Sequence, residues 1–190
     1  MAVVVLALTA AGCLGHPPHE DPVRIPSTRA IPARVTPLRV TIIGDSLTQQ
    51  YGPAFQRVVQ EQGAVVTGRW HGGTNPVDDP WSTWVREWSG VDYVVLQDAA
   101  VLWQDVHHDL DEYLAAWQAL VDSAHAALRP GGQVIVMDGN QPDLSSIQGV
   151  DRFVDQVDPD SPDGIHWTEA GSTAQAALLC RQLFEQDTCR

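Results

Sequence analysis

The sequence contains no lysine, and all 11 of its basic residues are arginines. A Schiff base, a Ser–Lys dyad and a phosphate-binding loop of the Walker type each need a lysine amine, so these chemistries are excluded. A serine nucleophile in this chain would therefore need another base, and histidine is the natural one.

Positive charge is also scarce, because 24 acidic residues outnumber the basic ones and give a net charge of −13. Nucleic acids and anionic membrane surfaces attract basic footprints, so neither is an expected partner. The length of 190 residues and the 44% hydrophobic content suit one globular domain with a sizeable core. We find no internal repeat.

Long hydrophobic runs are missing as well. The apolar stretch at residues 2–13 is shorter than the roughly 20 residues that a membrane-spanning helix needs. It resembles the core of a signal peptide, and Ala10-Ala11-Gly12-Cys13 resembles a bacterial lipobox, whose cysteine is lipidated. A buried strand or a disordered leader is the alternative.

This reading predicts three segments: a signal peptide and lipobox at 1–13, a flexible tether rich in Pro, His and Arg at 14–37, and a folded domain at 38–190. The protein would be exported, either as an outward-facing lipoprotein of the cell membrane or in secreted form. Its one link to the membrane would be a lipid anchor at Cys13.

Only three cysteines are present. With Cys13 lipidated, Cys180 and Cys189 remain as a possible pair that would join the last helix to the C-terminal tail. Disulfides persist in oxidising compartments, which fits export. Two free thiols are the alternative.

Short β-branched runs alternate with helical patterns along the domain. This alternation predicts an α/β fold whose mostly parallel sheet is covered on both faces, with the site at the carboxyl ends of the strands. The expected strands are 40–43, 64–67, 92–96 and 133–137; the expected helices follow Ser46 and Asp79 and span 109–128 and 168–184, with a further possible helix at 147–157.

Ser46 lies where the first strand turns into a helix. Backbone N–H groups at a helix start lack partners inside the helix, so they can stabilise an alkoxide or a developing oxyanion. The alternative is that Ser46 is only the N-cap of that helix.

Two blocks carry a family resemblance. Gly44-Asp45-Ser46-Leu47 resembles the GDSL signature of the SGNH hydrolases, and Asp163-Gly164-Ile165-His166 resembles their Asp-x-x-His block. The resemblance implies a three-layer α/β/α, flavodoxin-like fold with Ser46 as nucleophile. One loop can present both His166 as base and Asp163 as its orienting partner. Otherwise, His166 is a surface residue at a turn leading into a helix.

The resemblance also implies an oxyanion hole formed by the N–H groups of Ser46 and of a glycine, for which Gly73 fits better than Gly72. The family's third donor, the asparagine of a Gly-x-Asn-Asp block, is missing after the third strand. Gln97, Gln104 and Asn140 are the candidate replacements.

Two other groups of residues favour structural roles. The acid-rich stretch at 107–112 has metal-ligand residue types, but it better fits the first turn of a helix, and we expect no metal or cofactor. Trp81, Trp84 and Trp88 form a helical stripe typical of a core or lid, with a sugar-stacking platform as the alternative.

These features together predict a serine esterase that cleaves an O-acyl ester through an acyl-Ser46 intermediate. The substrate would be a small-molecule ester or an acylated cell-envelope glycan. Acyl transfer to a sugar hydroxyl is one alternative. A non-catalytic, lipid-tethered binding protein on the same scaffold is the other.

Overall fold

The structure is a computed structural model that describes residues 36–98, 109–138, 144–184 and 189. The predicted signal peptide and lipobox at 1–13, with Cys13, lie outside the described residues, as do all but the last two residues of the predicted tether. Gln104 and Asn140 also lie outside them.

Five strands form one sheet in the order β2-β1-β3-β4-β5, and every neighbouring pair is parallel. This is the strand order of flavodoxin-like folds. The predicted α/β fold with a parallel sheet is thereby confirmed. The strands are β1 (Arg39–Gly44), β2 (Val65–Trp70), β3 (Val91–Gln97), β4 (Leu128–Asp138) and β5 (Arg152–Asp155).

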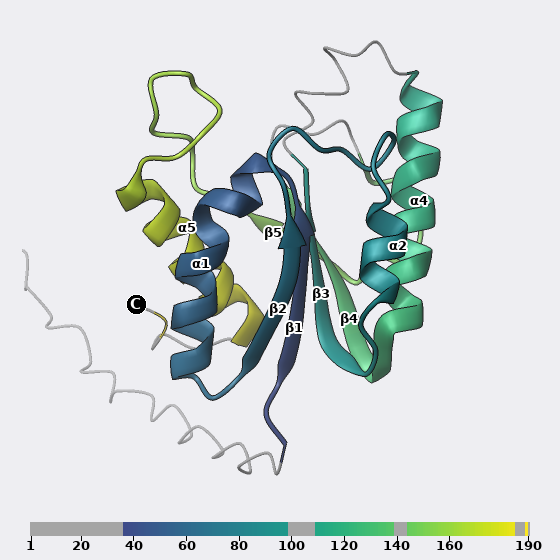
Figure 1. Ribbon diagram of the computed structural model, residues 1–190, viewed down its shortest axis with the longest axis horizontal. Coiled ribbons are helices and arrows are strands. Elements are labelled where there is room, and N and C mark those ends of the chain that lie inside the picture. Colours follow the sequence, from purple (N-terminus) through teal and green to yellow (C-terminus); the bar gives the residue numbers. More distant parts are fainter. Residues whose placement is uncertain (1–35, 99–108, 139–143, 185–188, 190) are drawn as a thin grey trace, which may run out of the picture. The chain divides into compact units, whose positions relative to one another are not determined.

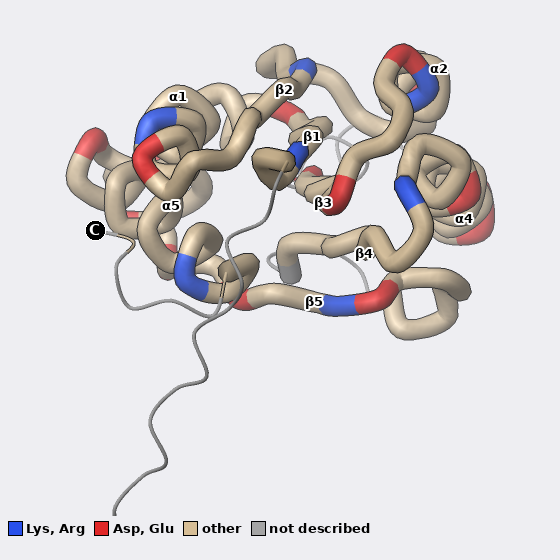
Figure 2. The backbone as a smooth tube through the Cα atoms, turned by 90° about the horizontal axis from the view of Figure 1, so that it is seen from below, with Lys and Arg blue, Asp and Glu red and all other residues tan. Residues whose placement is uncertain are grey.

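Helices cover both faces of the sheet (Figures 1 and 2). On one face α1 (Ser46–Glu61) packs beside α5 (Glu169–Phe184); on the other α2 (Trp81–Arg86) packs beside α4 (Leu110–Ala127). Each pair closes its own core, the first around Tyr51 and Leu179 and the second around Trp117. None of the described helices combines the length and apolar character needed to cross a membrane.

The tryptophan stripe belongs to the second core. Trp81 and Trp84 are buried in the cluster that contains Trp117 of α4, and Trp88 packs against the same cluster. The core interpretation of the stripe is confirmed. The helix expected after Asp79 is α2, which begins at Trp81; the Asp79 carboxylate does not cap it and accepts the Asn75 N–H instead.

One predicted helix is wrong. The stretch at 147–157 contains β5, a strand at the sheet edge that pairs with β4 alone. The helix expected after Ser46 is α1, which runs through Pro53 without a break.

Cys180 and Cys189 form a disulfide. The bond joins α5 to the end of the chain, and both residues are fully buried in the first core. Of the two arrangements left open by the sequence, the structure has the bridged one.

Candidate active site

Ser46 is the first residue of α1, directly after the end of β1. Its neighbour Asp45 is the N-cap: the buried Asp45 carboxylate accepts the Leu47 N–H at 2.9 Å. The interpretation of Ser46 as the N-cap is therefore wrong. Because Asp45 caps the helix, the Ser46 hydroxyl is left to interact outside it.

The glycine before this turn is required by a close approach. A Cβ at Gly44 would lie 1.9 Å from the Thr48 Oγ1 and 2.8 Å from the backbone oxygen of Gln97. Both distances are shorter than van der Waals contact, so any larger residue would push the first turn of α1 away from β3. Gly44 thus fixes where Ser46 stands at the edge of the sheet.

His166 reaches Ser46 from the loop between β5 and α5. The Ser46 Oγ and the His166 Nε2 are 3.1 Å apart, although the residues are 120 positions apart in the chain. The His166 Nδ1 lies 2.7 Å from the Asp163 Oδ2. The fold therefore brings together the three residues that the two sequence blocks suggested.

Asp163 is held as a carboxylate by several donors. Its Oδ1 accepts the backbone N–H groups of His166 and Ile165, each at 2.9 Å, and the Ser161 hydroxyl at 2.7 Å. The His166 N–H, followed by the His166 ring and then the Ile165 and Ser161 donors, holds the Asp163 pKa well below its usual range.

The charge on Asp163 determines the tautomer of His166. An ionised carboxylate only accepts hydrogen bonds, so the His166 Nδ1 carries the ring proton that faces it. The Nε2 of the neutral ring then has its lone pair free and accepts the Ser46 O–H. This is the arrangement that a general base for Ser46 requires.

Two glutamines in the first turn of α1 hold the loops on either side of Ser46. The Gln49 Oε1 accepts the Gly72 N–H at 2.9 Å, and the Gln50 Oε1 accepts the Trp167 N–H at 3.0 Å. The second bond anchors the residue that follows His166. Neither glutamine was predicted from the sequence, and their position within one turn of Ser46 is the one signal that could have indicated them.

The loop carrying Asp163 and His166 has further anchors. The Trp167 indole N–H donates to the Val157 carbonyl at 2.9 Å, while the Val157 N–H donates to the buried Gln175 of α5 at 2.7 Å. Asp160 accepts both the backbone N–H and the hydroxyl of Thr168 at 2.6 Å. These bonds hold the loop at both of its ends.

The glycine loop after β2 lies against the serine. A Cβ at Gly72 would be 3.6 Å from the Ser46 Cβ, so Gly72 directly adjoins it. Its N–H is occupied by Gln49, whereas within the described chain the Gly73 N–H has no hydrogen-bond acceptor. Gly73 also has a φ of +80°, which favours glycine. Of the two glycines, Gly73 is therefore the one whose N–H can donate to an oxyanion.

Gln97 does not serve as the third oxyanion donor. Its buried amide accepts the Thr48 hydroxyl at 2.9 Å, and its Nε2 donates to the Gln156 Oε1 at 3.2 Å. Gln97 therefore ties β3 to α1 and to the segment after β5.

The described part of the acid-rich stretch, from Asp109 on, forms a helix start, whereas residues 107 and 108 lie outside the described residues. Asp109 caps α4 by accepting the Asp111 N–H, and Asp111 and Glu112 occupy its first turn, as predicted. Among the described residues no group of His, Cys, Asp and Glu is arranged to hold a metal ion.

The three-layer fold, with a Ser–His–Asp chain at the carboxyl edge of a parallel sheet, has the architecture of the SGNH hydrolases. Solved structures share this fold. A family two carbohydrate esterase from Clostridium thermocellum aligns with a TM-score of 0.60 at 13% identity, over 82% of this chain and 66% of that one. The present chain thus spans slightly less than two thirds of that esterase.

A family 3 carbohydrate esterase from Talaromyces cellulolyticus aligns with a TM-score of 0.57 at 14% identity, over 78% of this chain and 97% of the other. The periplasmic domain of a Salmonella ser. Paratyphi A lipopolysaccharide acetyltransferase aligns with a TM-score of 0.54 at 14% identity, over 79% and 85% of the two chains. No known family profile and no curated protein sequence matches the chain.

Proposed function

We propose that the protein is a serine esterase that cleaves an O-acyl ester through an acyl-Ser46 intermediate. The observation that carries the proposal is the hydrogen-bonded chain from Ser46 to His166 to Asp163, with contacts of 3.1 Å and 2.7 Å. A protein that only binds its ligand would not need this arrangement. The geometry therefore favours a catalytic function over a binding one.

Acylation of the serine follows from the tautomer. The Ser46 Oγ attacks the ester carbonyl carbon while the His166 Nε2 takes the hydroxyl proton, and Asp163 stabilises the imidazolium that forms. In this proposal the N–H groups of Ser46 and Gly73 donate to the negative charge that develops on the carbonyl oxygen. When the C–O bond breaks, the alcohol leaves with the proton from His166 and the acyl group stays on Ser46.

Deacylation repeats these steps with a second nucleophile. His166 takes a proton from water, the resulting hydroxide attacks the acyl-serine, and the carboxylic acid leaves as Ser46 recovers its proton. A sugar hydroxyl in place of water would give O-acyl transfer, the alternative that the acetyltransferase among the structural neighbours supports. Product analysis with and without an added sugar acceptor separates the two reactions.

We assign the substrate to the O-acyl esters of carbohydrates. Two of the structural neighbours are carbohydrate esterases, and one of these was solved in complex with a cello-oligosaccharide. The N-terminal segment is interpreted as an export signal, and a glycan of the cell envelope would be within reach of an exported protein. The buried Cys180–Cys189 disulfide supports an oxidising compartment.

Lipid anchoring at Cys13 is tested separately from catalysis. Expression in a bacterial host with radiolabelled palmitate should label the wild-type protein and leave Cys13→Ser unlabelled. The labelled protein should partition with membranes. An unlabelled wild type would contradict the lipoprotein assignment and leave the esterase proposal intact.

The first experiment on catalysis is covalent labelling with a fluorophosphonate, which phosphonylates an activated serine as fluoride leaves. Wild type should react, and both Ser46→Ala and His166→Ala should lose the label. His125→Ala, on α4, is the matched control and should react like wild type. A folded wild type that stays unlabelled would reject the esterase and favour a binding protein.

A further inference from the structure

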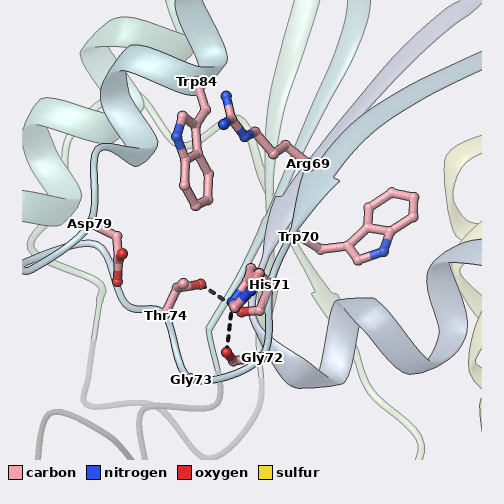
Figure 3. A pocket seen from close by; sticks show the side chains of 8 residues that line it. All are labelled: Arg69, Trp70, His71, Gly72, Gly73, Thr74, Asp79 and Trp84. Atoms are coloured by element: carbon pink, nitrogen blue, oxygen red, sulfur yellow. Dashed lines mark hydrogen bonds between the residues drawn. The ribbon is translucent and has the colours of Figure 1, made fainter.

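A cavity of about 460 Å³ lies beside the candidate active site. Its walls are the end of β2, the glycine loop at 71–74, Asp79 and Trp84 (Figure 3). Gly72 belongs both to the wall of this cavity and to the surroundings of Ser46, since its Cβ position is 3.6 Å from the Ser46 Cβ. A group bound in this cavity would therefore lie next to Gly72, the residue that adjoins Ser46.

The lining combines the indole rings of Trp70 and Trp84 with hydrogen-bonding side chains. The His71 Nδ1–H donates to the Gly72 carbonyl at 2.8 Å, which leaves Nε2 of the neutral ring as an acceptor. One Asp79 carboxylate oxygen accepts the Asn75 N–H at 3.0 Å, and in Figure 3 this carboxylate projects toward the same space as Trp84. Arg69, at the end of β2, adds a guanidinium to the lining.

Arg69 is not an isolated positive charge. Its guanidinium lies 4.6 Å from the centre of the Trp84 ring and donates to the Glu87 carboxylate at 2.9 Å. Asp79 adds a second carboxylate to the cavity. Two carboxylates against one guanidinium leave this region with no excess of positive charge, on a chain whose net charge is −13.

The lining is mainly apolar, but the hydrogen-bonding groups of Arg69, His71 and Asp79 within it argue against a hydrocarbon acyl chain as the occupant. Such a chain would remove water from Arg69, His71 and Asp79 without giving them new hydrogen bonds, which is costly. A polyhydroxylated ring offers donors and acceptors to all three, and its apolar face can lie against the Trp84 edge. The volume also falls within the usual range of small-molecule sites.

We propose that this cavity binds the alcohol part of the ester as an uncharged sugar, and that Asp79 and Glu87 reject sugars bearing a carboxylate. The inference rests on the proposed esterase function and specifies the substrate class of the same site. The His71 Nε2 and the free Asp79 oxygen accept sugar hydroxyls, while Arg69 donates to them. The net charge of −13 also repels sugars bearing a carboxylate at longer range.

The test compares two esters that differ only at C6 of the sugar. One is a mono-O-acetylated methyl glucoside, and the other is the methyl glycoside of glucuronic acid, acetylated at the same position and carrying a free carboxylate. Wild type should show a kcat/KM about fivefold or more higher for the neutral ester at low salt, from like-charge repulsion across roughly 6 Å near the surface. The preference should shrink as salt is raised. Equal values for the two esters would overturn the proposal.

The residue assignment is tested with Asp79→Asn, which keeps an acceptor for the Asn75 N–H and removes the charge. Its preference for the neutral ester should fall severalfold through a lower KM for the glucuronide ester. Glu61→Gln, an exposed charge removal at the far end of α1, should keep the wild-type preference. An Asp79→Asn preference equal to that of wild type would overturn the role of this carboxylate.

A sugar-free ester distinguishes a failure of the sugar assignment from a failure of the esterase function. If wild type hydrolyses p-nitrophenyl acetate but neither sugar ester, the sugar assignment is overturned while the serine chemistry stands. If wild type hydrolyses none of these esters and resists the fluorophosphonate, the esterase function fails and the inference fails with it.

Discussion

Asp163 bonds His166 rather than Ser46, yet it determines which ring nitrogen of His166 carries a proton. In Asp163→Asn the amide would offer its N–H₂ to the His166 Nδ1 and favour the wrong tautomer, with the proton on Nε2. We expect kcat on p-nitrophenyl acetate to fall by about 10³–10⁴, the scale known for such a change in serine proteases. Steady-state kinetics measure this fall.

The matched control for this variant is Asp158→Asn, an exposed aspartate on the same loop. It should keep kcat within about twofold of wild type, in line with the small effects of most surface substitutions. A kcat for Asp163→Asn that equals the control would show that His166 does not depend on this carboxylate.

Gln50 is expected to act through the position of His166. Gln50→Met removes the acceptor for the Trp167 N–H, so His166 should be held less closely against Ser46. We expect kcat to fall about tenfold with little change in KM, because small misplacements of a catalytic group cost rate rather than binding. Gln60→Met, on an exposed position of the same helix, should leave kcat near the wild-type value.

Gln50→Glu separates positioning from simple loss of structure. The carboxylate still accepts the Trp167 N–H, so kcat should recover relative to Gln50→Met. Its negative charge stabilises the His166 imidazolium, so the acid limb of the pH–rate profile should move to higher pH. An unmoved profile combined with no recovery would argue that Gln50 only supports folding.

The site was predictable from sequence where a residue acts through its own chemistry. Ser46, Asp163 and His166 stand in two recognisable blocks, and their residue types state what they could do. Gln49 and Gln50 could not be found in this way, because polar residues in a first helical turn look like an ordinary solvent-facing surface. Their importance comes from two loops that only the folded chain brings beside α1.

At the scale of elements, the loop between β5 and α5 links the site to acid stability. Asp160 and Asp163 have pKa values below their usual range, Asp160 chiefly through the Thr168 hydroxyl and Asp163 chiefly through the His166 N–H. A carboxyl with a lowered folded-state pKa stabilises the fold above its unfolded pKa, and this stability is lost as the pH falls through the folded value.

The melting temperature of wild type should therefore drop as the pH is lowered from about 5 toward 2. The double variant Asp160→Asn/Asp163→Asn should melt lower at pH 7 and show a shallower drop, because neither amide titrates. Thermal unfolding followed by circular dichroism across this pH range measures both slopes. Parallel slopes for wild type and variant would contradict the prediction.

Burial explains part of which elements could be predicted, although the β-branched start of the edge strand β2 was recognised as well. The runs that became β1, β3 and β4 lie in the middle of the sheet and carry continuous apolar sequence. Strand β5 has only four residues, of which Val154 is buried and Phe153 is 42% exposed. So short and half-exposed an edge strand has no clear period, and its bonds to β4 decide its structure.

The disulfide is expected to stabilise α5 without taking part in catalysis. Cys180 and Cys189 are separated by 9 residues, and closing a loop of that size gives about 2.5 kcal/mol on the chain-entropy scale. Cys180→Ala/Cys189→Ala should lose about that much stability in urea unfolding. Its kcat at 25 °C should stay near the wild-type value, and a kcat that falls in step with stability would contradict this separation.

For the molecule as a whole, the site depends on parts of the chain that differ in how firmly they are held. Ser46 stands between the central strand β1 and helix α1, whose residues fill the first core. His166 stands on a loop that follows the edge strand β5, with His166 and Asp163 both partly exposed. Regions with few buried contacts open at lower free energy than the core does.

We therefore expect urea to remove the candidate activity before it unfolds the sheet. Fluorophosphonate labelling of Ser46 should fall at a lower urea concentration than the far-ultraviolet circular dichroism signal, because separating His166 from Ser46 needs only the loop to open. Dilution out of that urea should restore labelling at once, since the core has stayed folded. Coincident midpoints would instead show that the loop unfolds together with the core, which would make the bonds from Gln50 and Gln175 part of the global stability of the fold.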